Sequence, residues 1–173
     1  RDLVRSRGLG DVYKRQKQGY CQLDPEMLLY TKDRDSIHLS EIKRKEYTLV
    51  LRYSTQCCST CVEDILRKMR KFEEQYPDID ILLFTTYRVQ IEKKDFQRIC
   101  RFFPKVYNVF SLGIPLDEEV VPYLFVLDRG MRVIDTFIPD KDLPKLTNRY
   151  FERITTTLSR NKAYNYKYYK KEI

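Results

Sequence analysis

The stretch that decides the fold is residues 47–72, YTLVLRYSTQCCSTCVEDILRKMRKF. Its first part, Tyr47–Tyr53, is rich in β-branched and aromatic residues and predicts a central strand. From Cys61 onward, apolar side chains recur at the three- and four-residue spacing of an amphipathic helix. They are Val62, Ile65, Leu66, Met69 and Phe72. The stretch therefore predicts a strand, a loop with three cysteines, and a helix.

Strands and helices alternate on both sides of this stretch. The sequence predicts further strands at residues 27–31, 37–39, 79–86, 123–128 and 132–138, a short strand or an extended loop at 106–112, and helices at 94–103 and 142–158. The first two strands form an N-terminal hairpin, and Arg129-Gly130 turns the chain between the last two. This order predicts an α/β fold in which helices flank a mixed central sheet.

The chain has 173 residues, of which 42% are hydrophobic, enough for one domain with a sizeable core. We assign that domain to residues 27–158, with a linker at 17–26 and a basic, tyrosine-rich tail at 159–173. Residues 1–16 resemble translated sequencing adaptor and are set aside as unstructured. We expect that the natural N-terminus, with any signal peptide or lipid anchor, is missing.

The net charge of +8 is concentrated at the two ends. Residues 1–18 and 159–173 each carry a net charge of +4, whereas residues 19–158 hold 22 basic and 22 acidic side chains. Because the body is neutral, we expect no nucleic-acid partner. No stretch approaches the roughly 20 apolar residues that a membrane-spanning helix needs, so no membrane span is expected in this fragment.

The Cys58-Ser59-Thr60-Cys61 motif lies where the strand gives way to the helix. A helix N-terminus favours negative charge, and the thiolate is the form of cysteine that attacks a disulfide. Cys58 would therefore be the nucleophile. Cys61, one turn further along, could attack the resulting mixed disulfide and release the product.

The other cysteines leave alternatives open. Cys57 is adjacent to Cys58 and could take its place as nucleophile, or act as an accessory thiol. A structural zinc site needs four ligands, and the single histidine, His38, is expected at the surface of the hairpin, so we predict neither a metal nor a cofactor. Cys100 is expected as a buried structural thiol, and Cys21 lies outside the predicted fold.

Residues 27–158 resemble the thioredoxin-like superfamily, in particular the TlpA/ResA-type and AhpC/TSA-type redoxins. The resemblance is carried by the loop 53–61, by Val121-Pro122 and by Leu127-Asp128-Arg129-Gly130. It implies a thioredoxin-like fold and thiol–disulfide exchange with a protein dithiol or disulfide and a redox partner protein. Val121-Pro122 resembles the pair that carries the family's cis-proline, which positions substrate. The resemblance also implies a periplasmic or cell-envelope location, with the cytoplasm still open.

The chain departs from the family pattern at several positions. Cys57 stands where a tryptophan is usual, and Ser59-Thr60 replaces the Gly-Pro of reducing thioredoxins. Arg52 falls near the place of the buried acid; it would favour a thiolate if it reached the sulfur, or else would pair with an Asp or Glu. Because of these departures, a thioredoxin-fold binding module with little turnover stays an alternative function.

Two further readings rest on the cysteine spacing. Thr55-x-x-Cys58 matches part of the thiol-peroxidase signature, although Leu51 stands in the place of its proline. Cys57-x-x-x-Cys61 has the spacing of Sco-type copper proteins, although no histidine follows His38. The first is a less favoured alternative, and the second is weaker because its distal ligand is missing.

Overall fold

A computed structural model describes residues 21–87 and 89–169. The chain divides into two compact units, Arg1–Ile138 and Pro139–Ile173, which we describe separately. The sequence predicted a single domain reaching to residue 158, so this division places a boundary where none was expected. In the described part of the chain, every helix lacks the length or apolarity needed to cross a membrane.

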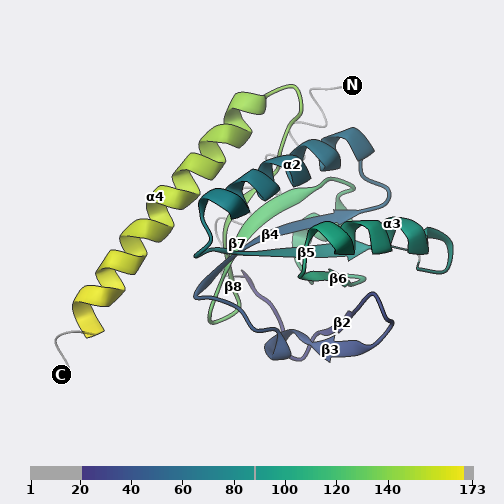
Figure 1. Cartoon of the computed structure of the whole chain (residues 1–173), viewed down its shortest axis with the longest axis horizontal. Coiled ribbons are helices and arrows are strands. Elements are labelled where there is room, and N and C mark those ends of the chain that lie inside the picture. Colours follow the sequence, from purple (N-terminus) through teal and green to yellow (C-terminus); the bar gives the residue numbers. More distant parts are fainter. Residues whose placement is uncertain (1–20, 88, 170–173) are drawn as a thin grey trace. The chain divides into compact units, whose positions relative to one another are not determined.

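The first unit is built on one sheet of eight strands in the order β1-β8-β7-β4-β5-β6-β2-β3 (Figure 1). The strands are β1 (Cys21–Gln22), β2 (Leu28–Tyr30), β3 (Ser36–His38), β4 (Tyr47–Ser54), β5 (Asp80–Thr86), β6 (Val106–Asn108), β7 (Tyr123–Asp128) and β8 (Arg132–Phe137). The central strands β4, β5 and β6 are parallel, and the other pairs are antiparallel. This mixed sheet with an N-terminal hairpin confirms the predicted fold class.

Two helices cross between the parallel strands. Helix α2 (Ser59–Gln75) connects β4 to β5, and α3 (Val89–Phe102) connects β5 to β6. Because both connections step in the same direction along the sheet and such crossovers are right-handed, both helices lie on one face (Figure 1). Helix α2 packs on that face through a stripe of buried side chains, which are Val62, Ile65, Met69 and Phe72. Burial of each such side chain contributes about 1.5–3 kcal/mol.

Side chains of β4 alternate between the two faces of the sheet. Val50 belongs to a hydrophobic core on the face opposite α2, together with Leu82, Phe84 and Phe125 from the neighbouring strands. The segment after β6 and a short 3-10 helix, η2 (Pro115–Glu118), cover this second face with Val109, Leu112, Ile114 and Leu116. Arg52 follows Val50 by two residues, so it shares this face and points away from α2.

The structure corrects two details of the sequence prediction and narrows a third. Cys21 and Gln22, within the predicted linker, pair with β8 in the sheet, and Leu23 after them is buried. Helix α3 begins five residues earlier than predicted, with a kink at Glu92. Of residues 106–112, for which a short strand or an extended loop was expected, only Val106–Asn108 form strand β6, and beyond them the Phe110 carbonyl accepts a hydrogen bond from Arg52. Residues 1–16 lie outside the described residues.

The second unit consists of the helix α4 (Pro144–Tyr169). The sequence predicted a helix to Leu158 followed by a tail, but the helix continues through most of that tail. Within α4, the guanidinium of Arg153 lies 5.4 Å from the centre of the Tyr150 ring, which meets Phe151 edge-on.

Candidate functional site

Cys58 and Cys61 lie at the start of α2, as the sequence predicted. Cys58 is the exposed N-cap residue of the helix, and its Sγ lies 3.2 Å from Thr60 Oγ1. Cys61 is half-buried, three residues further along the first turn. Residues three apart on a helix lie on the same side, so the exposed sulfur has the second cysteine behind it.

Cys57 occupies a different environment from its neighbour. It is buried, and its Sγ accepts a hydrogen bond from the Ser54 backbone N–H at 3.4 Å, with Ser54 Oγ at 3.6 Å. The Cys57 N–H in turn donates to the Ser54 carbonyl, which closes a tight turn after β4. A disulfide of a protein partner would reach Cys58 before it reached Cys57.

Arg52 is buried, and the hydrogen bonds of its side chain go to residues other than the cysteines. Its Nε donates to Asp117 Oδ1 at 2.9 Å, and its two terminal nitrogens donate to the carbonyls of Tyr53 and Phe110. This follows from the position of Arg52 in β4. Its side chain lies on the face of the sheet opposite α2, where the segment that carries Asp117 also lies. Of the two roles that the sequence left open for Arg52, the structure shows the ion pair.

Asp117 is the centre of a buried polar network. Besides Arg52, its carboxylate accepts hydrogen bonds from the Tyr123 hydroxyl at 2.8 Å, the Ser111 hydroxyl at 3.1 Å and the Leu112 N–H. Burial, and then the negative charge of Asp117, raise the pKa of Tyr123 above its ordinary value, so this hydroxyl stays a donor. The network ties η2 to β4 and β7.

Val121 and Pro122 come to the same edge of the sheet as the cysteine loop. The register pairs Arg52 with Tyr123, so the residues before Tyr123 lie opposite the end of β4. Pro122 is buried and Val121 is half-buried. The Val121–Pro122 bond is trans, like every peptide bond among the described residues, so the expected cis-proline is not found in this structure.

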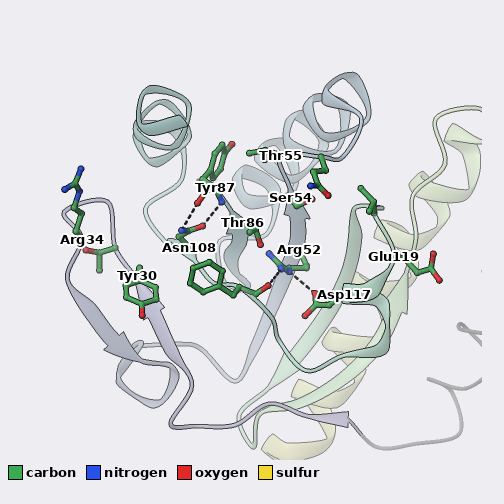
Figure 2. A pocket seen from close by; sticks show the side chains of 14 residues that line it. Tyr30, Arg34, Arg52, Ser54, Thr55, Thr86, Tyr87, Asn108, Asp117 and Glu119 are labelled. Carbon is green, nitrogen blue, oxygen red and sulfur yellow. Dashed lines mark hydrogen bonds and ion pairs between the residues drawn. The ribbon is translucent and has the colours of Figure 1, made fainter. Parts of the chain in front are cut away.

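A cleft of about 890 Å³ opens at the carboxyl ends of β4, β5 and β6, beside the cysteine loop (Figure 2). Ligands commonly bind at this end of parallel strands. Its lining comprises Tyr30, Thr31, Arg34, Arg52, Ser54, Thr55, Gln56, Thr86, Tyr87, Asn108, Phe110, Asp117, Glu119 and Val120. Val120 and Glu119, and not the predicted Val121 and Pro122, line it before β7.

Asn108 holds one wall of the cleft in place. Its side-chain amide accepts the Tyr87 N–H at 2.7 Å and donates to the Tyr87 carbonyl at 3.1 Å, so it pairs with the end of β5 as a strand would (Figure 2). The Tyr87 hydroxyl lies 3.3 Å from the Tyr53 hydroxyl. Burial raises the pKa of both tyrosines, so both remain protonated at neutral pH.

The remaining cysteines lie away from the motif. Cys100, expected as a buried thiol, is half-buried on α3, and burial raises the pKa of its thiol. Cys21 lies in β1, where burial likewise raises its pKa. Within residues 21–87 and 89–169, no group of three His, Cys, Asp or Glu side chains is arranged to hold a metal ion.

Sequence reasoning missed Asp117, Asn108 and Tyr87. One signal was present, because a lone arginine within the apolar run of β4 requires a buried anion. That signal does not say which of the acidic residues supplies it. Asp117 stands in a row of three acids, Asp117-Glu118-Glu119, that looks like a solvated surface turn.

Comparison with solved structures shows the fold directly. A thiol peroxidase from Chromobacterium violaceum matches with a TM-score of 0.56 at 13% identity, over 83% of this chain and 88% of its own. A domain from Cytophaga hutchinsonii assigned as a thiol–disulfide isomerase matches at 0.53 and 16%, over 80% and 97%. A Bacteroides vulgatus protein assigned as a thiol–disulfide oxidoreductase matches at 0.51 and 16%, over 75% and 87%.

No protein-family model matches the chain, and no curated protein matches its sequence. The structural matches nonetheless agree with the observed element order. The protein therefore has a thioredoxin-like fold, and its own Cys58-x-x-Cys61 motif lies at the start of the first crossover helix.

Proposed function

We propose that this protein exchanges disulfides with protein partners through Cys58 and Cys61. The observation that carries the proposal is the placement of an exposed Cys58 at the N-cap of α2, with Cys61 one turn behind it. The unpaired N–H groups and the dipole of a helix N-terminus stabilise a thiolate there. The fold shared with redoxins supports the same kind of chemistry.

In the reducing direction, the Cys58 thiolate attacks one sulfur of a partner disulfide. A Cys58–partner bond forms, the partner's S–S bond breaks, and the leaving sulfur takes up a proton. The deprotonated Cys61 then attacks Cys58 Sγ, which releases the partner's second thiol and leaves a Cys58–Cys61 disulfide. Two electrons pass from this protein to the partner, and a redox partner protein restores the dithiol. The same steps in reverse oxidise a partner dithiol.

We place this activity in the cell envelope or periplasm. The support is the resemblance to TlpA/ResA-type redoxins. Fractionation of cells that make the protein naturally, with detection by a specific antibody, tests the location. Recovery in the cytoplasmic fraction would contradict it.

Reduction of insulin with dithiothreitol as electron donor tests the activity. The native chain should accelerate insulin precipitation, and Cys58→Ser should abolish the acceleration. Cys61→Ser should also lose turnover and, when it is mixed with insulin in the absence of dithiothreitol, should form a mixed disulfide that is visible on a non-reducing gel. Cys57→Ser is the matched control and should keep activity within about threefold, because Cys57 is buried outside the proposed pair.

Three outcomes would redirect the proposal. Activity that survives in Cys58→Ser but is lost in Cys57→Ser would make Cys57 the nucleophile. A native chain that does not reduce insulin with any reductant would favour the binding module with little turnover. Rapid consumption of hydrogen peroxide that requires Cys58, without insulin reduction, would favour the thiol peroxidase.

A further inference from the structure

The cleft beside the cysteine loop is not used by the exchange chemistry itself. Thr55 and Gln56 line it and lie three and two residues before Cys58, so its occupant lies beside the loop that leads to the proposed nucleophile. An inference about its occupant rests on the proposed function, since that function requires a protein segment to lie against Cys58.

The middle of the cleft is aromatic. Tyr30 from β2 and Tyr87 after β5 contribute their rings (Figure 2), and Phe110 after β6 is the third aromatic residue of the lining. Phe110 is 78% exposed and is braced edge-on by Tyr30, with 6.5 Å between the ring centres. An aromatic side chain held at the mouth of a cleft offers apolar area to an incoming apolar group.

The two ends of the cleft carry opposite charges. Arg34, in the turn between β2 and β3, stands at one end, and Glu119, in the loop before β7, stands at the other (Figure 2). Neither side chain has an ion-pair partner among the described residues. The floor between them is electrically neutral because Arg52 and Asp117 pair with each other.

The strand order sets the distance between these ends. Strands β2 and β7 are four strand spacings apart in the sheet, which amounts to roughly 19 Å at about 4.8 Å per spacing. An extended chain advances about 3.3 Å per residue, so about six residues cover this distance.

We propose that the cleft holds an extended segment of the substrate protein, about six residues long, beside its reactive cysteine. The segment carries an apolar or aromatic side chain in its middle, against Tyr30, Tyr87 and Phe110. It carries an acidic side chain at the Arg34 end and a basic side chain at the Glu119 end. Charge complementarity thus selects a dipolar segment.

Peptides without cysteine separate this inference from the redox chemistry. The peptides are labelled hexapeptides with blocked termini, serine in place of cysteine, a central phenylalanine, and end residues that are Asp and Lys, both Asp, or both Lys. Binding to the full chain is measured by fluorescence anisotropy at low salt. The native chain should bind the Asp/Lys peptide about fivefold more tightly than either of the others, whichever way the peptide lies.

Charge reversal should change the preferred peptide in a defined way. Arg34→Glu should favour the Lys/Lys peptide, Glu119→Lys should favour the Asp/Asp peptide, and the double variant should favour the Asp/Lys peptide again. Phe110→Ala should weaken binding of all three without changing their order. Salt at roughly 0.5 M should remove the preferences, because exposed charges are then screened.

Equal binding of the three peptides by the native chain would overturn the inference, and so would single variants that keep the native preference. Both results are independent of turnover, because no peptide can exchange a disulfide. If the charge preferences appear and insulin reduction does not, the dipolar-segment inference stands and the proposed enzymatic function fails. Circular dichroism of each variant confirms that it is folded.

Discussion

The two sides of the site are built in opposite ways. The cysteine loop is local, since Cys57, Cys58 and Cys61 lie within five consecutive residues and their placement follows from the end of a strand and the start of a helix. The Arg52–Asp117 floor of the cleft joins residues 65 positions apart through a 2.9 Å ion pair. Cys58 in the loop is exposed, whereas Arg52 in the floor is buried and each of its three side-chain nitrogens donates a hydrogen bond. Changes to the loop should therefore affect chemistry, and changes to the floor should affect stability.

The largest expected effect on stability is at the floor. Arg52→Met should lower the free energy of unfolding by about 3 kcal/mol, because it leaves Asp117 charged and buried without its cation. Urea denaturation measures the loss. Cys58→Ser, on the exposed loop, should change stability by less than about 0.5 kcal/mol.

The matched double variant Arg52→Met/Asp117→Leu sharpens this contrast. It removes both charges, so it should regain much of the stability that the single variant loses. If the single and double variants were equally destabilised, packing and not the unpaired charge would account for the loss.

A smaller effect is expected at the wall between the two regions. Asn108→Ala should cost about 2 kcal/mol, since it leaves the N–H and carbonyl of Tyr87 without their side-chain partner. It should also weaken binding of the Asp/Lys peptide, because Tyr87 loses its support. Asn108→Asp is the control, since it restores an acceptor for the Tyr87 N–H and should recover part of the stability. Unchanged peptide binding in Asn108→Ala would show that Tyr87 does not depend on Asn108.

A stabilising substitution is expected at Thr48, near the start of the strand that carries Arg52. Thr48 is fully buried and its Oγ1 has no hydrogen-bond partner among the described residues. Thr48→Val keeps the shape and removes the unpaired hydroxyl, so it should raise the free energy of unfolding by about 1 kcal/mol. Thermal and urea denaturation test this, with Thr48→Ser as a control that keeps the hydroxyl but loses the methyl group. A loss of stability in Thr48→Val would mean that the hydroxyl is paired.

The smallest effect concerns Asp80, at the start of β5 and far from the cleft end of the sheet. Burial alone would raise its pKa, but the Lys105 ammonium and the Lys45 N–H bond its carboxylate, and the pKa is lowered overall. The stabilisation is therefore complete above the unfolded pKa of about 3.9 and is lost as the pH falls through the lower folded value.

Denaturation midpoints between pH 5 and pH 3 measure this contribution. The native chain should lose more stability across that range than Asp80→Asn, by less than about 1 kcal/mol because the ion pairs are partly exposed. Well below the folded pKa, the Asp80 carboxyl is protonated in both the folded and the unfolded state. Its charge then makes no difference to the stability of the two chains. If the stability of the two chains fell in parallel as the pH was lowered, the stabilisation assigned to the Asp80 carboxylate would be contradicted.

Much of the fold could be predicted because its signals are local. Tyr47–Tyr53 and the stripe on α2 are periodic patterns that occur within a single element, and both predictions are confirmed. The predicted linker failed at Cys21, because a two-residue strand has no periodicity to detect and exists only through its pairing with β8. The roles of Cys58 and Cys61 remain predictions, although their positions follow the expected geometry.

The sequence alone determined that a cysteine pair stands at the start of a helix after a central strand, because spacing and side-chain period act over a few residues. Only the tertiary structure decided what lies around that pair. It turned Arg52 to Asp117 and away from the cysteines, and it brought Tyr30, Tyr87, Phe110 and Glu119 to one edge of the sheet. The physical reason is that strand order and pairing bring together residues distant in sequence, and no local pattern records those partners.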